Sequence, residues 1–226
     1  MKKIALSDID FGEEETNEVI KVLKSKWLSM GEVTQEFEKK FASLLGVKHA
    51  ISVANGTAAL HLANSIFEIK EGDEVIVPSL TFVATSNSVI YVGGKPVFAD
   101  VEGNDNFNIS PERIKEKISS KTKGIIAVHY AGYPCDMKPI MDIARKNNLF
   151  VIEDAAHAPG VKLDEKMLGT IGDIGCFSFF SNKNLVTGEG GMIVTNNDKI
   201  AEDIKRKRSH GMTSLSWDRH KGHAFS

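Results

Sequence analysis

The stretch from residue 124 to residue 154 reads GIIAVHYAGYPCDMKPIMDIARKNNLFVIED. Two short apolar runs, Gly124–Val128 and Leu149–Glu153, flank a segment, Asp136–Asn147, in which apolar residues recur at helical spacing. A strand, a helix and a strand in this order form a βαβ unit, whose two strands lie parallel in one sheet. The stretch therefore predicts an α/β fold.

The same alternation continues on both sides of this unit. Helical spacing predicts helices at Glu13–Ser25, Val33–Leu45, Thr57–Ile69, Thr81–Tyr91, from Ser110 onward and at Asp198–Arg208. Short apolar runs predict strands at Ile51–Val53, Val75–Val77, Pro96–Phe98, Gly175–Phe179 and Gly191–Val194. We expect a largely parallel sheet with helices on both faces, and the first two helices are expected to pack on that sheet.

Composition and charge limit the classes of function. The chain has 226 residues, of which 42% are hydrophobic and 26% charged, as in ordinary globular proteins. Its 28 Lys and Arg residues nearly balance its 30 Asp and Glu residues. Such a balance gives no broad positive surface for nucleic acid or for an acidic membrane, so neither is an expected partner.

The N-terminus and the cysteines indicate a cytoplasmic protein. Acidic residues follow Met1–Ser7 before an apolar signal region can develop, and no later apolar run approaches membrane-spanning length. The two cysteines, Cys135 and Cys176, fit a reducing compartment and lack the CxxC spacing of a metal or redox site. No metal is expected.

A predicted strand and a predicted helix are joined by the run Asn55-Gly56-Thr57-Ala58-Ala59-Leu60. A glycine there lets the backbone approach an anion, Thr57 can donate a hydroxyl hydrogen bond, and free N–H groups at a helix start favour phosphate. A simple Gly-Thr helix cap would explain the same residues. The chain contains neither G-x-G-x-x-G after a strand nor G-x-x-x-x-G-K-[ST], which argues against dehydrogenases and nucleotide hydrolases.

Asp154 follows a buried strand at its carboxyl end, where open α/β sheets place their ligand sites. Its carboxylate could pair with a protonated pyridine nitrogen, and His157 could reach the face of such a ring or its 3-oxygen. The alternatives are an aspartate that caps a helix and a histidine satisfied in the core. Glu153 is expected to point to the opposite side of the sheet, and Phe82, after another strand end, could lie on the ring or simply fill the core.

Lys183 lies between an apolar strand and the glycine cluster at residues 188–191. The apolar residues around it, Phe177, Phe179, Phe180 and Leu185, suggest a partly buried amine, and desolvation lowers the pKa of a lysine toward the nucleophilic range. Such an amine near a carboxylate could hold an aldehyde cofactor as a Schiff base. Lys183 and Asp154 therefore predict catalysis with pyridoxal 5′-phosphate.

Five segments together resemble the DegT/DnrJ/StrS family of pyridoxal-phosphate-dependent nucleotide-sugar aminotransferases, in the family's order and spacing. They are residues 55–60, 78–85, 129–137, 153–157 and 177–191. The resemblance implies the large domain of fold type I transferases, with a mostly parallel seven-stranded sheet. It covers essentially the whole chain.

The resemblance also implies roles for individual residues. Lys183 would form the Schiff base, and Asp154 would bind the pyridine nitrogen. Phe82 would stack on the ring, and His157 would lie near the 3-oxygen. The phosphate would contact residues at the family's anion-binding positions, which here are Gly56, Thr57, Ala58 and Ser178.

The resemblance extends to domains, partners and reaction. Residues 1–208 would form the cofactor-binding large domain, and residues 209–226 the start of a connection to a C-terminal small domain that the chain lacks. The expected enzyme is a homodimer that moves an amino group, from glutamate as the expected donor, to a nucleotide-linked keto sugar in polysaccharide or lipopolysaccharide biosynthesis. A sugar dehydratase or epimerase and an inactive truncated domain are the alternatives. Some dehydrating relatives carry histidine at the position of Lys183, so the lysine favours amino transfer.

Overall fold

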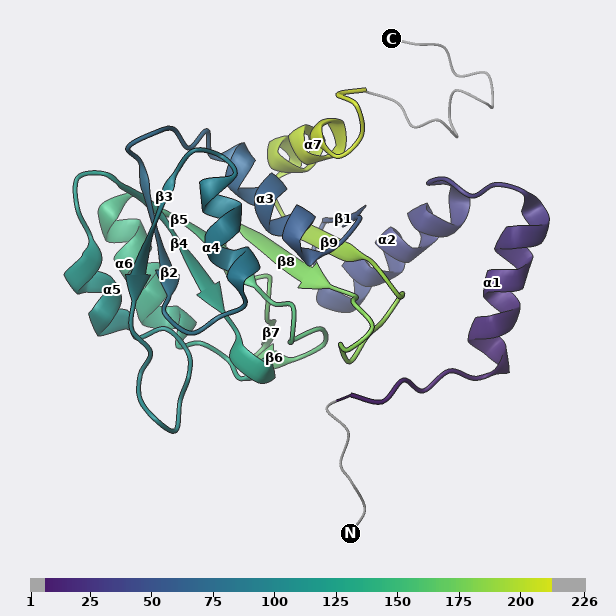
Figure 1. The fold of residues 1–226 in the computed structure, drawn as a ribbon, viewed down its shortest axis with the longest axis horizontal. Helices are drawn as coiled ribbons and strands as arrows, with labels where there is room; N and C mark the ends of the chain where they lie inside the picture. Colours follow the sequence, from purple (N-terminus) through teal and green to yellow (C-terminus); the bar gives the residue numbers. More distant parts are fainter. Residues whose placement is uncertain (1–6, 213–226) are drawn as a thin grey trace.

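Seven strands form one sheet in the order β1-β9-β8-β5-β4-β2-β3 in the computed structural model, which describes residues 7–212 (Figure 1). The strands are β1 His49–Val53, β2 Glu74–Pro78, β3 Lys95–Ala99, β4 Thr122–Val128, β5 Phe150–Asp154, β8 Ile174–Ser178 and β9 Gly191–Thr195. The strands β3, β2, β4, β5 and β8 are neighbours in that order, and each pair among them is parallel. Strand β9 runs antiparallel to both β8 and β1. The predicted α/β fold with a mostly parallel seven-stranded sheet is confirmed.

Helices cover both faces of the sheet, as predicted. The α-helices of residues 7–212 are α1 Glu13–Ser25, α2 Glu32–Leu45, α3 Gly56–Ile66, α4 Val83–Ile90, α5 Pro111–Lys117, α6 Met137–Asn147 and α7 Asp198–Lys207. One face packs against α3, α4 and α7, and the other packs against α2, α5 and α6. Within β5, Val151 belongs to the core under α5 and α6, whereas Ile152 belongs to the core under α3 and α4. Successive residues of β5 thus face opposite layers, as strand geometry requires.

The first helix does not pack on the sheet, contrary to the prediction. No residue of α1 is buried, and its apolar Val19 and Leu23 are exposed. Figure 1 shows α1 lying apart from the sheet. The second helix does pack there, because Phe41 and Leu45 of α2 are buried against β8 and β9 residues. Amphipathic spacing specifies that a helix forms, but the surface that it meets depends on the rest of the chain.

Most boundaries of helices and strands differ from the sequence expectations by one to three residues. Helix α3 ends at Ile66 and helix α4 begins at Val83, with Phe82 as its N-cap residue. A short antiparallel pair, β6 Lys162–Leu163 and β7 Lys166–Met167, was not predicted. Two residues per strand are too few for the period-two pattern that identifies a strand from sequence.

Within residues 7–212, the structure contains neither a membrane-spanning helix nor a metal-binding cluster. No helix in that range combines the length and the apolarity needed to cross a membrane. No three His, Cys, Asp or Glu side chains of the same range come together as a metal site would need. Of the predicted connecting segment at residues 209–226, residues 213–226 lie outside the described part of the chain.

Candidate active site

The predicted site residues gather at one edge of the sheet. β4, β5 and β8 are parallel, so their carboxyl ends meet there. β1 points the same way as β8, because each is antiparallel to β9 between them. The turn after β1, the end of β5 and the end of β8 are therefore neighbours, which is where open α/β sheets bind ligands.

Asp154 is buried at the end of β5 and held by two donors. Its Oδ2 accepts a hydrogen bond of 2.9 Å from the Thr85 hydroxyl, and its Oδ1 accepts one of 3.2 Å from the Ala156 N–H. The Thr85 oxygen lies 2.8 Å from the Thr81 hydroxyl. Because a carboxylate only accepts, Thr85 gives its hydrogen to Asp154 and Thr81 gives its own to Thr85. This chain of hydroxyl groups from the start of α4 fixes the carboxylate.

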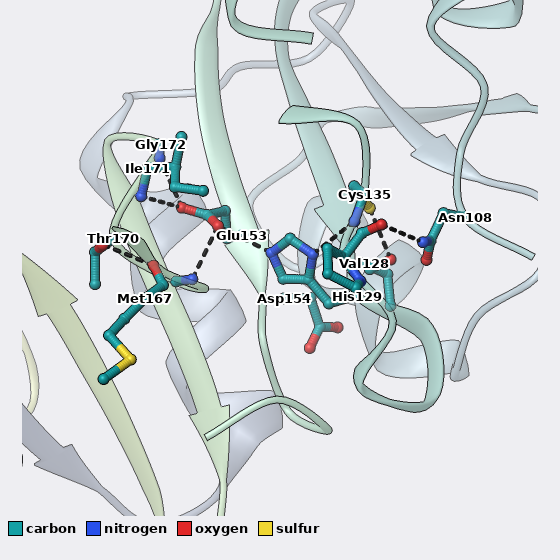
Figure 2. Close-up of polar contacts among 12 residues, drawn as sticks. Asn108, Val128, His129, Cys135, Glu153, Asp154, Met167, Thr170, Ile171 and Gly172 are labelled. Carbon is teal, nitrogen blue, oxygen red and sulfur yellow. Dashed lines mark hydrogen bonds and ion pairs between the residues drawn. The ribbon is translucent and has the colours of Figure 1, made fainter. Parts of the chain in front are cut away.

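The alternative local roles for Asp154 and His157 are not borne out. No helix begins after Asp154, since the chain there continues in turns, so this aspartate is not a helix cap. His157 is only half-buried, and its Nδ1 accepts a hydrogen bond of 3.2 Å from the Ala131 N–H. Glu153 points away from Asp154, as predicted (Figure 2).

The turn before α3 is built against the end of β8. The Asn55 side chain caps α3 by accepting a hydrogen bond of 2.8 Å from the Ala58 N–H. A Cβ atom on Gly56 would lie 2.8 Å from Ser178 Cβ, closer than such atoms approach, so this position requires glycine. The predicted Gly-Thr helix start and the Ser178 hydroxyl thus adjoin. A helix N-terminus beside a hydroxyl group favours an anion.

Lys183 and His157 lie within electrostatic reach of Asp154. Burial lowers the pKa of Lys183 below its ordinary value, and the negative charge of Asp154 opposes that shift. Burial also lowers the pKa of His157, as does the positive charge of Lys183, while Asp154 again opposes the shift. The Lys183 amine and the His157 imidazole are therefore both partly desolvated and near enough to Asp154 for its charge to affect them.

Lys183 is half-buried, as predicted, but the aromatic residues near it in the sequence do not all contribute to that burial. Phe177 and Phe179 are fully buried in the core beneath α2, where their rings contact Phe41 edge-on. Phe180 and Leu185 remain exposed. The side chains of Phe177 and Phe179 pack into the same core, so they anchor the end of β8 ahead of the loop that carries Lys183.

Phe82 stands at the N-cap of α4 with 72% of its surface exposed. It lies one residue after Thr81, which is part of the hydroxyl chain to Asp154. The ring is therefore not core filling, which was the alternative at this position. Its predicted stacking on a cofactor remains a prediction.

Two contacts of the site were not predicted. Thr85 bonds to Asp154, and the Ala131 N–H bonds to His157. The spacing of Thr81 and Thr85, four residues apart at a helix start, is the signal that could have indicated one hydroxyl chain. The contact of Ala131 depends on a left-handed backbone, with φ of 52°, that the sequence gives no reason to expect for alanine.

The chain is similar in sequence and fold to known sugar aminotransferases. GDP-perosamine synthase of Escherichia coli O157:H7 is 45% identical over 94% of this chain and 58% of its own length. A solved structure titled Helicobacter pylori PseC, an aminotransferase in pseudoaminic acid biosynthesis, is 34% identical over 95% of this chain and 58% of its own, with a TM-score of 0.89. A putative sugar aminotransferase from Streptococcus pneumoniae in its PLP form is 29% identical over 89% of this chain and 57% of its own, with a TM-score of 0.84.

The chain spans about half the length of the curated relatives it matches. A family model matches nearly all of it, over residues 9–226. The solved aminotransferases share its sheet and helices closely, which agrees with the fold type that the motifs implied. The chain belongs to the DegT/DnrJ/EryC1/StrS aminotransferase family.

Proposed function

We propose that this chain forms the cofactor-binding part of a pyridoxal-phosphate-dependent aminotransferase that acts on a nucleotide-linked keto sugar. The observation that carries the proposal is the placement of buried Asp154 at the end of β5, at the sheet edge where Gly56 adjoins Ser178 and where the loop with Lys183 follows β8. Residues 1–208 would make up this domain. That the last described helix ends at Lys207 supports the boundary.

The residues present fit this cofactor. Lys183 would supply the amine that the cofactor's aldehyde needs, and Asp154 the carboxylate that its pyridine nitrogen needs. The turn next to Ser178 would supply hydrogen-bond donors for its phosphate. The close approach of Gly56 to Ser178 supports a backbone cradle that a side chain would fill. Thr57, Ala58 and the exposed ring of Phe82 would complete the binding set. When bound, pyridoxal phosphate would supply an electron sink for carbanion chemistry.

Lys183 would act first as nucleophile and then as acid and base. Burial lowers the pKa of its amine, so a larger share of the amine is neutral near pH 7 than in an exposed lysine. Its Nζ would accept the proton from Cα of the amino-acid donor and later return a proton. The Asp154 carboxylate, fixed by Thr85, would pair with the positive charge of the ring nitrogen.

The names of relatives support the substrate class. One is a GDP-perosamine synthase and another acts in pseudoaminic acid biosynthesis, so we infer a nucleotide-linked keto sugar as acceptor and glutamate as donor. Lysine at position 183 supports amino transfer over sugar dehydration or epimerisation. We also infer a homodimer that works in the cytoplasm, without nucleic-acid or membrane partners. These inferences rest on relatives of which this chain spans little more than half the length.

Absorbance spectroscopy followed by product analysis tests the proposal. A full-length protein containing this chain should show a visible band with pyridoxal phosphate that shifts on adding glutamate, and Lys183→Ala should lose the band. Glutamate and a GDP-linked keto sugar together should yield an amino sugar and 2-oxoglutarate. Lys162→Ala, a change of a lysine outside the site, is the matched control. A full-length protein that shows no cofactor band under any condition would refute the proposal.

A further inference from the structure

A buried pair, Glu153 and His129, lies directly behind the candidate active site. Both side chains are fully buried, and His129 Nε2 lies 2.9 Å from Glu153 Oε2 (Figure 2). The Glu153 side chain points to the face of β5 opposite to that of Asp154. A buried charge at this position is costly unless it is fully hydrogen-bonded.

Four donors satisfy the Glu153 carboxylate. Oε2 accepts from the Gly169 N–H at 2.8 Å and from His129, and Oε1 accepts from the N–H groups of Ile171 and Gly172 at 2.6 Å each. A carboxylate has about four acceptor sites, so every one is used. Glu153 therefore joins β5 both to the loop at residues 169–172 and to the end of β4.

The hydrogen bonds also assign the proton on His129. Its Nδ1 accepts a hydrogen bond of 3.1 Å from the Cys135 N–H, so the ring proton must lie on Nε2 and point to Glu153. The backbone of His129 is fixed as well, because its N–H donates to the Asp154 carbonyl at 3.1 Å. His129 is thus held at both its ring and its backbone.

The turn η1, Tyr130–Gly132, begins immediately after His129. Asn108 holds it from the other side: its Oδ1 accepts from the Tyr130 N–H at 3.0 Å, and its Nδ2 donates to the Pro134 carbonyl at 2.8 Å. Ala131 in this turn has a left-handed φ of 52°, which persists only when the surroundings impose it. With this backbone, the Ala131 N–H reaches Nδ1 of His157 at 3.2 Å.

We propose that Glu153 and His129 are positioning residues that hold the Tyr130–Gly132 turn so that Ala131 fixes His157 in its Nε2–H form. An Nδ1 that accepts a hydrogen bond leaves the ring proton on Nε2. His157 then offers one N–H donor to an acceptor atom of a bound ligand, and no free basic nitrogen. That this ligand is pyridoxal phosphate rests on the proposed function, whereas the tautomer itself is a property of the chain alone.

Long-range nitrogen–hydrogen correlation NMR of the ¹⁵N-histidine-labelled chain, without cofactor, reads the tautomer. His157 of the wild type should be in the Nε2–H form, with His157→Asn identifying its signals. Glu153→Gln and His129→Leu should convert a substantial fraction to the Nδ1–H form. His61→Gln, a change of an exposed histidine on α3, should leave the tautomer unchanged. Melting followed by circular dichroism would show which variants are folded.

A double-mutant cycle gives a second readout. If Glu153 acts through His157, then Glu153→Gln introduced into the wild-type protein should lower kcat or cofactor affinity about tenfold. The same change introduced into the His157→Asn variant should have a much smaller effect. An Nδ1–H form in the wild type would overturn the proposal whether or not the variants fold. An unchanged tautomer in a folded Glu153→Gln, or additive effects in the cycle, would also overturn it. If the wild-type protein binds no cofactor, the proposed function is contradicted. The role of Glu153 and His129 is still tested in that case, because the His157 tautomer is measured without cofactor.

Discussion

The Thr85 hydroxyl donates a hydrogen bond of 2.9 Å to Oδ2 of Asp154, joining residues 69 positions apart in the chain. One comes from the first turn of α4, and the other ends β5. This bond ties the carboxylate to a helix on the same face of the sheet. The orientation of Asp154 therefore depends on the packing of α4, and not on β5 alone.

Replacing Thr85 by valine tests this bond. Valine keeps the shape but removes the donor, and the buried carboxylate loses one of its two partners. The free energy of unfolding should fall by about 1–3 kcal/mol, measured by urea denaturation. Thr85→Ser keeps the hydroxyl and should lose less. Equal stability of the valine and serine variants would contradict this role.

A methyl group on Gly56 should damage the anion turn. Its Cβ would lie 2.8 Å from Ser178 Cβ, so Gly56→Ala forces the turn and β8 apart. We expect a cost of about 1–3 kcal/mol, seen as roughly tenfold or more weaker binding of pyridoxal phosphate in an absorbance titration. Gly103→Ala, whose nearest neighbour would be an exposed side-chain oxygen at 3.4 Å, is the control.

Ser178→Gly should partly rescue Gly56→Ala, because it removes the Cβ that the new methyl group meets. The rescue is incomplete if the Ser178 hydroxyl itself contacts the phosphate, as proposed. A double variant that binds as poorly as Gly56→Ala alone would show that the contact with Ser178 is not the cause.

The pH dependence of Lys183 follows from its surroundings. Burial lowers the pKa of the amine and Asp154 opposes the shift, so trapping of pyridoxal phosphate with borohydride should reach half its maximum rate below the ordinary lysine pKa. Asp154→Asn removes the opposing charge and should move the midpoint to still lower pH. A midpoint that rises in this variant would contradict the assignment.

The same shift has a consequence for stability. Because the folded state disfavours the charged amine, the contribution of Lys183 to the free energy of unfolding is unfavourable below the folded pKa. This unfavourable contribution becomes smaller as the pH rises toward 10.5, the pKa of the lysine in the unfolded chain. Lys183→Met should therefore stabilise the cofactor-free chain near pH 7, and this gain should shrink as pH rises. Urea denaturation at several pH values measures it.

Both cysteines should be unreactive in the folded chain. Cys135 and Cys176 are buried, and burial raises the pKa of each thiol above its ordinary value. Since the thiolate is the reactive form, Ellman's reagent should find almost no free thiol at pH 8 in the native protein. In guanidinium chloride it should find both. Rapid reaction of one thiol without unfolding would contradict the packing around it.

The fold was largely predictable because its elements have strong local signals. The apolar runs at β2, β4 and β5 and the periodic helices between them define the parallel part of the sheet. The packing of α1 was not predictable in this way, because a periodic pattern indicates that a helix forms but not which surface it contacts. The pair β6 and β7 is too short to give a periodic signal.

The sequence alone determined the types of residue available at the site and their places at strand ends. Local sequence motifs are enough to identify Lys183, Asp154, His157 and the Gly56 turn. Only the tertiary structure decided how they are held. The bonds of Thr85 to Asp154, of Ala131 to His157 and of His129 to Glu153 join residues 69, 26 and 24 positions apart. Such contacts exist only once the sheet brings separate strand ends to one edge, and no local pattern encodes that meeting.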